Sequence, residues 1–212
     1  MAHPSVLLAD DHTLVLQAFR KLLEQEFDIV GTVSDGCELV SIAPRLNPNI
    51  IVLDIGMPGG GGMVAGLELR KLLPRTKLIV LTMNEDPEIA REALRLWASA
   101  YVLKKAGGSE LIYAIRETLR GKSYVTPAIA QRLEEAFIRD PRPEHKRELT
   151  VRQREVLQLL GEGHTMREVA NRLHVTTRTV AFHKYRIMEE FGLKSNSDLV
   201  KLAIRERLIS PA

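Results

Sequence analysis

The sequence contains little cysteine and few aromatic residues. Of its 212 residues, one is cysteine (Cys37) and 5% are aromatic. A single cysteine cannot form a disulfide within the chain, and Cys37 has no cysteine or histidine neighbours at the spacing of a metal site. These absences argue against a disulfide-stabilised secreted domain and a cysteine-based zinc module, and they fit a reducing cytoplasm.

Long apolar runs are also missing. No apolar stretch approaches the roughly 20 residues that a membrane-spanning helix needs. The N-terminus, MAHPSVLLADD, lacks the basic region and the cleavage site of a signal peptide. We therefore expect a cytoplasmic protein without a membrane partner. Its 45% hydrophobic residues suffice for packed cores, and its length allows one large domain or two small ones.

The net charge is small, +3, but it is unevenly distributed. Residues 1–121 contain 13 Lys and Arg against 15 Asp and Glu, a net charge of −2. Residues 122–148 contain 6 against 5, and residues 149–212 contain 11 against 7, which gives +1 and +4. An acidic first part and a basic last part indicate two modules, the second suited to a polyanionic partner.

Short apolar runs alternate with helix-length stretches through residues 1–121. The runs are continuous, as expected of parallel strands buried on both faces. They are Val6–Ala9, Ile29–Val33, Ile50–Leu53, Leu78–Leu81 and Tyr101–Leu103. Between them, apolar residues recur at spacings of three and four, as in Leu111, Ile115 and Leu119. Five strands alternating with five helices predict an α/β domain, and its size favours a flavodoxin-like, doubly wound five-stranded parallel sheet of order 2-1-3-4-5.

The pattern changes after residue 121. We interpret residues 122–148 as a linker that includes a helix near residues 127–137. That helix is followed by a charged stretch, residues 139–148, which contains two prolines.

Residues 149–212 are predicted to form an all-α domain of four helices. Two of the helices are expected to begin at capping boxes, in which a threonine precedes a Glu or Gln by three residues. These pairs are Thr150 with Gln153 and Thr165 with Glu168. The other two helices are expected to begin near Thr176 and Ser197.

Polar residues end four of the predicted strands. They are Asp10 and Asp11 after the first strand, Asp54 after the third, Thr82 at the end of the fourth and Lys104 after the fifth. In a sheet of this order, ligands bind beyond the carboxyl ends of the strands, at the switch between strands 1 and 3. Three carboxylates that meet there repel unless a cation joins them, and hard oxygen ligands favour Mg²⁺. A divalent ion beside a carboxylate prepares a site for phosphoryl transfer, and a lysine and a hydroxyl could hold the remaining phosphoryl oxygens.

The segments ADD, VLDIGMP, VLT and YVLKK resemble the receiver domain of bacterial two-component response regulators, from residue 5 to about residue 121. The resemblance implies that Asp54 is the phosphoryl acceptor, a carboxylate nucleophile that forms an acyl phosphate. It also implies that Asp11 and Asp54 ligate Mg²⁺ directly, together with the backbone carbonyl of Gly56, and that Asp10 acts through water.

The same resemblance implies three switch residues. Thr82 would bond the phosphoryl group, Lys104 would pair with it, and Tyr101 would swing inward after Thr82 moves. Lys105 follows Lys104 directly, and the spacing of 22 residues from Thr82 favours Lys104 for this role.

The helix expected over Thr177–Phe191 has two distinct faces on a helical wheel. The core face consists of Val180, Ile187 and Phe191. The opposite face consists of Arg178, Ala181, Phe182 and Tyr185. Exposed aromatic side chains among basic ones suit DNA, with the basic groups on phosphates and the apolar ones against base edges. The alternative is that Phe182 and Tyr185 pack on the linker or on another subunit.

The segments LTVRQREVLQLL, GHTMREVANRL and TTRTVAFHKYRI resemble the LuxR-type four-helix DNA-binding domain. Its helix-turn-helix places the second helix in the major groove. The residues expected to contact DNA are Thr177, Arg178, Thr179, Ala181, Phe182, His183, Lys184, Tyr185 and Arg186. His183 matches the histidine of that family but lies at the flank of the wheel, which favours a backbone contact or a structural role.

The whole chain is similar to a response regulator of the NarL/FixJ family. This resemblance implies a transcriptional regulator, not an enzyme, that receives a phosphoryl group on Asp54 from a sensor histidine kinase and so changes its dimerisation and DNA binding. A homodimer would bind a pseudo-palindromic site. One alternative is an orphan regulator, independent of phosphorylation, whose receiver serves only for dimerisation. The other is an aspartyl phosphatase, which would need a second aspartate where Gly56 stands.

Overall fold

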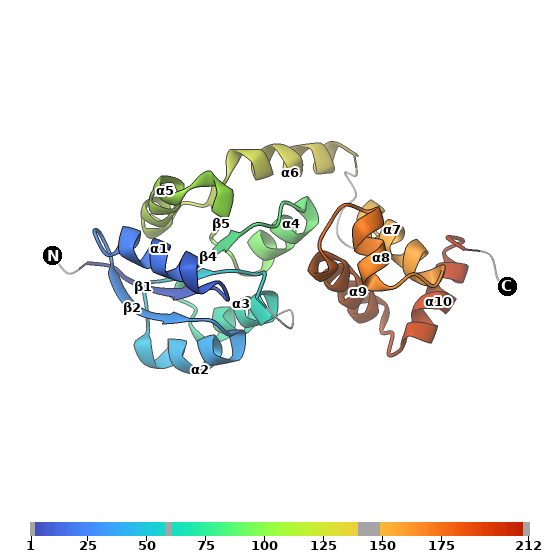
Figure 1. The fold of residues 1–212 in the computed structure, drawn as a ribbon, viewed down its shortest axis with the longest axis horizontal. Coiled ribbons are helices and arrows are strands. Elements are labelled where there is room, and N and C mark those ends of the chain that lie inside the picture. Colours follow the sequence, from blue (N-terminus) through green and yellow to red (C-terminus); the bar gives the residue numbers. More distant parts are fainter. Residues whose placement is uncertain (1–2, 58–60, 140–148, 210–212) are drawn as a thin grey trace. The chain divides into compact units, whose positions relative to one another are not determined.

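The computed structural model describes residues 3–57, 61–139 and 149–209. The chain divides into two compact units, residues 1–135 and residues 136–212. The first unit is an α/β structure built on a parallel sheet, and the second is helical (Figure 1).

The sheet has six parallel strands in the order β2-β1-β3-β4-β5-β6. They are β1 (Ser5–Ala9), β2 (Asp28–Val33), β3 (Ile50–Leu53), β4 (Lys77–Thr82), β5 (Ala100–Leu103) and β6 (Tyr124–Val125). The order of the first five strands is the predicted one. A sixth strand was not predicted, because its two residues are too few to carry a periodic pattern, and it lies in the segment interpreted as a linker.

Each of the first five strands is followed by an α-helix. These helices are α1 (Thr13–Leu23), α2 (Gly36–Leu46), α3 (Gly61–Leu72), α4 (Pro87–Leu96) and α5 (Gly108–Leu119), and a short 3₁₀ helix, η2 (Lys104–Ala106), precedes α5. Helices α1 and α5 contact each other over one face of the sheet, and α2, α3 and α4 lie over the other face (Figure 1). Strand residues are buried on both faces, as in Leu7 and Leu8 of β1, which explains why the strands appear as continuous apolar runs.

Helix α6 (Pro127–Arg139) follows β6 almost directly. Its first turn is anchored by Ile129, which is fully buried, and by backbone bonds from Ile129 and Ala130 to the carbonyl of Thr126. The predicted charged stretch after this helix lies, from residue 140 to residue 148, outside the described residues.

The second unit contains α7 (Val151–Gly161), α8 (Met166–Arg172), α9 (Thr177–Phe191) and α10 (Asn196–Arg205). The two predicted capping boxes are present at Thr150 and Thr165, and a third one begins α10 at Ser195, two residues before the predicted start. Among the helices of the described ranges, none combines the length and the apolar character needed to cross a bilayer.

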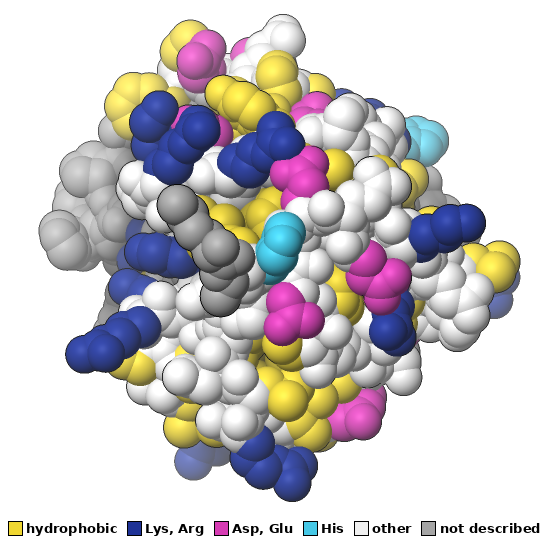
Figure 2. Space-filling model, turned by 90° about the vertical axis from the view of Figure 1, so that its left-hand side faces the viewer, with side chains coloured by type: hydrophobic (Ala, Val, Ile, Leu, Met, Phe, Trp, Pro, Cys, Tyr) yellow, Lys and Arg dark blue, Asp and Glu magenta, His cyan; other side chains and the backbone are white. Residues whose placement is uncertain are grey.

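The surface mixes charges of both signs. On the side of the molecule drawn in Figure 2, basic, acidic and hydrophobic side chains are interspersed, and no single kind forms a continuous area over that view.

Candidate functional site

Parallel pairing of β1 with β3 brings two carboxylates together at the carboxyl edge of the sheet. Ala9 of β1 pairs with Leu53 of β3, and the amide of Asp54 donates to the carbonyl of Ala9 at 2.8 Å. Asp10 and Asp54, the next residues along the two strands, therefore lie side by side, and each is only 4% exposed. Two such buried carboxylates repel each other and require a cation.

Lys104 supplies that positive charge. Its Nζ lies 2.6 Å from Oδ2 of Asp10 and 2.8 Å from Oδ2 of Asp54, and its side chain is 9% exposed. Burial disfavours the charged lysine, but the hydrogen bonds and charges of Asp10 and Asp54 outweigh it, so the pKa of Lys104 is raised. Its neighbour Lys105 points elsewhere, to Glu85, so the structure places Lys104 on the carboxylates.

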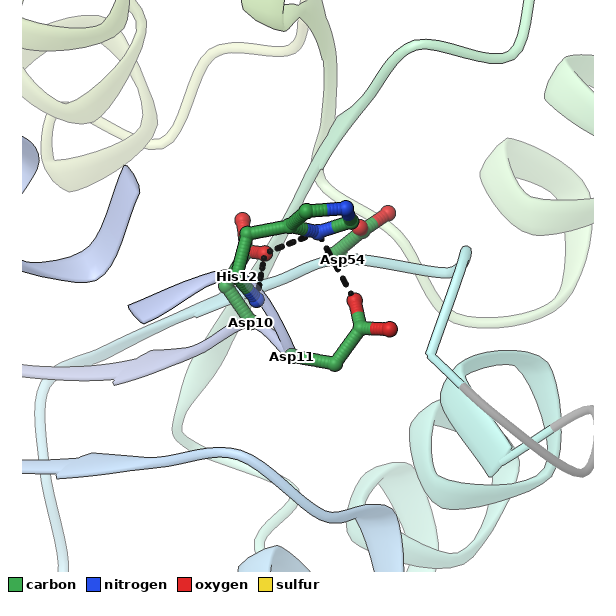
Figure 3. Close-up of side chains that lie close together, drawn as sticks. All are labelled: Asp10, Asp11, His12 and Asp54. Atoms are coloured by element: carbon green, nitrogen blue, oxygen red, sulfur yellow. Dashed lines mark hydrogen bonds and ion pairs between the residues drawn. The ribbon is translucent and has the colours of Figure 1, made fainter. Parts of the chain in front are cut away.

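Two further side chains complete the acidic cluster (Figure 3). His12 Nδ1 lies 3.0 Å from Oδ1 of Asp11 and 3.2 Å from Oδ1 of Asp10, while the amide of His12 donates to Asp10 at 2.9 Å. Each of Asp10, Asp11, His12 and Asp54 offers one potential ligand atom, and these atoms lie within 4.8 Å of one another. This spacing suits a divalent cation bound by oxygen ligands.

The predicted hydroxyl and aromatic residues lie next to this cluster. Thr82 ends β4 and is 2% exposed, and its Oγ1 accepts a hydrogen bond from the amide of Asn84 at 3.2 Å. Tyr101 of β5 is fully buried, and its hydroxyl donates to the carbonyl of Asn84 at 2.9 Å. Burial, followed by the charges of Asp86, Asp54 and Glu85, raises the pKa of Tyr101 well above its usual value.

The ring of Tyr101 points inward in this structure. The carbonyl of Asn84 gives the buried hydroxyl an acceptor, so that burying the ring leaves no unsatisfied donor. That the ring swings inward after a movement of Thr82 stays a prediction.

Helix α9 presents part of its predicted DNA-contacting set at the surface. Val180 and Ile187 are fully buried, as the wheel predicted. Thr177, Arg178 and Tyr185 are exposed, and Ala181, Phe182, Lys184 and Arg186 are partly exposed. Thr179 and His183 are not at the surface: they are 3% and 1% exposed, because they share the inner side of the helix with Val180 and Ile187.

Two protein families match the chain. The family described as "Response regulator receiver domain" matches residues 6–116, and the one described as "Bacterial regulatory proteins, luxR family" matches residues 147–203. The oxygen regulatory protein NreC of Staphylococcus carnosus (strain TM300) is 32% identical over 96% of this chain and 98% of its own length. This chain is a response regulator of the NarL/FixJ family.

Solved structures of response regulators are similar over nearly the whole length. RcsB from Salmonella enterica serovar Typhimurium, bound to the promoter P1flhDC in the presence of the phosphomimetic BeF3⁻, is 29% identical, with a TM-score of 0.64, over 94% of this chain and 97% of that one. A structure of two RcsB dimers bound to two parallel DNAs gives the same identity and TM-score. The first unit is accordingly a receiver domain, and α7 to α10 form a LuxR-type DNA-binding domain.

Sequence reasoning missed two contributors to the receiver site of this regulator. His12 follows the aspartate pair directly, and its proximity to two carboxylates was the available signal. Gly62, in the first turn of α3, was given no role from the sequence. A β-carbon at position 62 would lie 2.3 Å from Cα of Ile55 and 2.5 Å from the carbonyl oxygen of Asp54.

In the DNA-binding domain of the regulator, α9 carries its own counter-charges. Arg186 lies 3.1 Å from Oε1 of Glu190 and 3.5 Å from Oε2 of Glu189. Glu190 in turn accepts from Gln153 of α7 at 3.1 Å. Near Tyr185, which is 60% exposed, the ammonium group of Lys184 lies 5.6 Å from the centre of the ring. The charge of Arg186 is therefore partly offset within α9 itself.

Proposed function

We propose that this response regulator accepts a phosphoryl group on Asp54 from a sensor histidine kinase, and that the modification changes its dimerisation and its binding to DNA. The observation that carries the proposal is the position of Lys104, within 2.6 Å of Asp10 and 2.8 Å of Asp54 at the carboxyl edge of the sheet. A lysine held there is ready to exchange a carboxylate for a phosphoryl oxygen without leaving the site.

The chemistry follows from the groups around Asp54. One carboxylate oxygen attacks the phosphorus, and the bond from phosphorus to the histidine nitrogen of the kinase breaks as the acyl phosphate forms. The amide of Gly56 donates to Oδ1 of Asp54 at 2.7 Å and fixes the carboxylate plane. Lys104 then pairs with the phosphoryl oxygens, and the hydroxyl of Thr82 donates to one of them.

Mg²⁺ fits the donor set of this site. Asp10, Asp11 and Asp54 supply hard oxygen atoms, which Mg²⁺ prefers, and the four clustered ligand atoms lie close enough to share one ion. Asp11 and Asp54 would hold the ion with the backbone carbonyl of Gly56, and Asp10 would act through water. When bound, the ion neutralises negative charge on the phosphoryl oxygens.

For DNA, we propose that α9 enters the major groove with Thr177, Arg178, Ala181, Phe182, Lys184 and Tyr185. Arg178 and Lys184 would contact phosphates, and the apolar groups would contact base edges. Thr179 and His183 would support the helix from inside, and Arg186 would reach a phosphate only after leaving Glu189 and Glu190. A homodimer would bind two half-sites about one helical turn apart.

A selection from a pool of random duplexes tests this function. The full-length chain is incubated with Mg²⁺, with or without beryllofluoride as a phosphoryl analogue, and the bound duplexes are sequenced. We expect enrichment of a pseudo-palindromic site that is stronger with beryllofluoride. Equal enrichment in both samples would instead favour a regulator that works without phosphorylation.

A further inference from the structure

Glu85, in the loop between β4 and α4, is held by cations from two different elements. Lys105, the residue after Lys104, forms an ion pair with Glu85. Arg132 of α6 forms a second one, with Nη2 at 2.6 Å from Oε2, and its Nη1 donates to the carbonyl of Glu85 at 3.4 Å. The loop is thereby tied both to the segment that carries Lys104 and to the helix that leaves the receiver domain.

The same loop is tied to the phosphoacceptor site through Asn84. The amide of Asn84 donates to Oγ1 of Thr82, and the carbonyl of Asn84 accepts from the hydroxyl of Tyr101. Both residues that the site would recruit are therefore linked closely to Glu85. Thr82 is hydrogen-bonded to Asn84, the residue before Glu85. Lys104 precedes Lys105, which forms an ion pair with Glu85.

The contacts of α6 explain why Arg132 matters for this helix. Its first turn is fixed by the fully buried Ile129, whereas Arg132 lies one turn later, with a side chain that is 48% exposed. The ion pair with Glu85 thus holds a later part of α6 against the receiver. The hydrogen bond from Lys105 and the charges of Arg132 and Lys105 lower the pKa of Glu85, so this carboxylate stays charged at neutral pH.

We propose that the Glu85–Arg132 ion pair transmits the state of Asp54 to helix α6. The inference rests on the proposed phosphorylation of Asp54. A phosphoryl group there draws the hydroxyl of Thr82 away from the amide of Asn84 and draws Lys104 away from Asp10. Both shifts displace Glu85, one through Asn84 and the other through Lys105, and Arg132 passes the displacement to α6. Helix α6 is the last element of the receiver side before the DNA-binding domain in the chain, so its docking is where the state of Asp54 would be read out.

Amide hydrogen exchange of α6 tests this link in the full-length chain. Exchange of the peptides that cover residues 127–139 is measured with Mg²⁺, with and without beryllofluoride. In the wild type we expect beryllofluoride to change the exchange rate by about two- to fivefold, which lies within the range that one exposed ion pair can contribute. In Glu85→Gln and in Arg132→Gln, this change should fall to less than about half of the wild-type change.

Two variants keep the test specific. Arg132→Lys retains the positive charge and should retain most of the wild-type response. Gln131→Ala is the matched control on the same helix, because Gln131 is exposed and, among the described residues, its side chain bonds to Glu135 of the same helix at 3.0 Å. It should leave the response unchanged. A purely structural role of Arg132 would alter exchange equally with and without beryllofluoride, so the ratio between the two states would not move.

The outcomes separate this inference from the function beneath it. If residues around Asp54 respond to beryllofluoride but α6 does not, or if α6 responds equally in wild type, Glu85→Gln and Arg132→Gln, the ion pair carries no signal and phosphorylation of Asp54 still stands. If beryllofluoride leaves the residues around Asp54 unchanged as well, the proposed function is overturned, and the inference is overturned with it.

Discussion

Lys104 bridges Asp10 and Asp54, with one nitrogen within 2.8 Å of a carboxylate oxygen of each. A single side chain at the start of η2, directly after β5, thus offsets part of the negative charge of the two carboxylates that follow β1 and β3. The bridge places the positive charge where a phosphoryl group on Asp54 would need it.

Replacing Lys104 by Met should destabilise the receiver domain by about 3 kcal/mol, because the two buried carboxylates lose their partner. Added Mg²⁺ should recover part of this loss, since the ion replaces the missing charge. Urea unfolding with Mg²⁺ or with a chelator measures both effects. Lys105→Met is the control: its side chain is 51% exposed, so we expect a loss below about 1 kcal/mol. Equal losses in the two variants would contradict this role of Lys104.

The replacement Gly62→Ala should disturb the phosphoacceptor without touching a charged group. The added carbon has no room against the backbone of Ile55 and Asp54, so α3 or the strand end must shift. We expect a loss of about 1–3 kcal/mol in stability and slower uptake of a phosphoryl group. Val64→Ala, at an exposed position of the same helix, should change neither. Wild-type uptake by Gly62→Ala would show that the close approach is not needed for the reaction.

The exposed face of α9 predicts two kinds of loss in DNA binding. Tyr185→Ala should weaken binding to a selected duplex roughly tenfold, with an unchanged dependence on salt. Arg178→Ala should reduce the slope of log affinity against log salt by about one, because one phosphate contact is lost. Titrations at several salt concentrations measure both. Lys201→Ala, on α10 with a side chain that is 76% exposed, should be neutral, and an effect as large as that of Arg178→Ala would place the DNA elsewhere.

The capping box of α8 predicts that the stability of this helix depends on pH. Hydrogen bonds from the amide and the hydroxyl of Thr165 hold the pKa of Glu168 below its ordinary value of 4.5. A lowered pKa means that the charged Glu168 stabilises α8 above pH 4.5 and that this contribution disappears as the pH falls through the lowered value. Protection of residues 166–172 from amide exchange should therefore be lower in Glu168→Gln than in wild type at neutral pH. The difference should vanish in acid, and a difference that persists there would mean that charge is not the cause.

The sequence predicted the strands and the acidic edge because both depend on local pattern. Continuous apolar runs identify strands buried on both faces, and the polar residue that ends each run must lie at one edge of a parallel sheet. Asp10, Asp54, Thr82 and Lys104 were therefore predictable. The buried side of α9 was only partly predictable. Thr179 is a polar residue, yet it is buried, and its hydroxyl lies 2.9 Å from that of Thr176, the N-cap of the helix.

Other features depend on contacts between residues far apart in the chain. The ion pair of Glu85 with Arg132 joins two positions 47 residues apart, and neither residue differs in sequence context from an ordinary surface charge. The close approach of Gly62 to Asp54 depends on how the first turn of α3 packs on the end of β3. Such contacts carry no periodic signal, so the structure is needed to find them.

The most direct test of the proposed function is the mass of the intact protein after incubation with acetyl phosphate and Mg²⁺, for wild type and for Asp54→Ala. We expect one phosphoryl adduct on the wild type, none on the variant, and none on the wild type when a chelator is present. An adduct that persists in Asp54→Ala, or a wild type that takes up no phosphoryl group, would contradict the assignment of Asp54 as the acceptor.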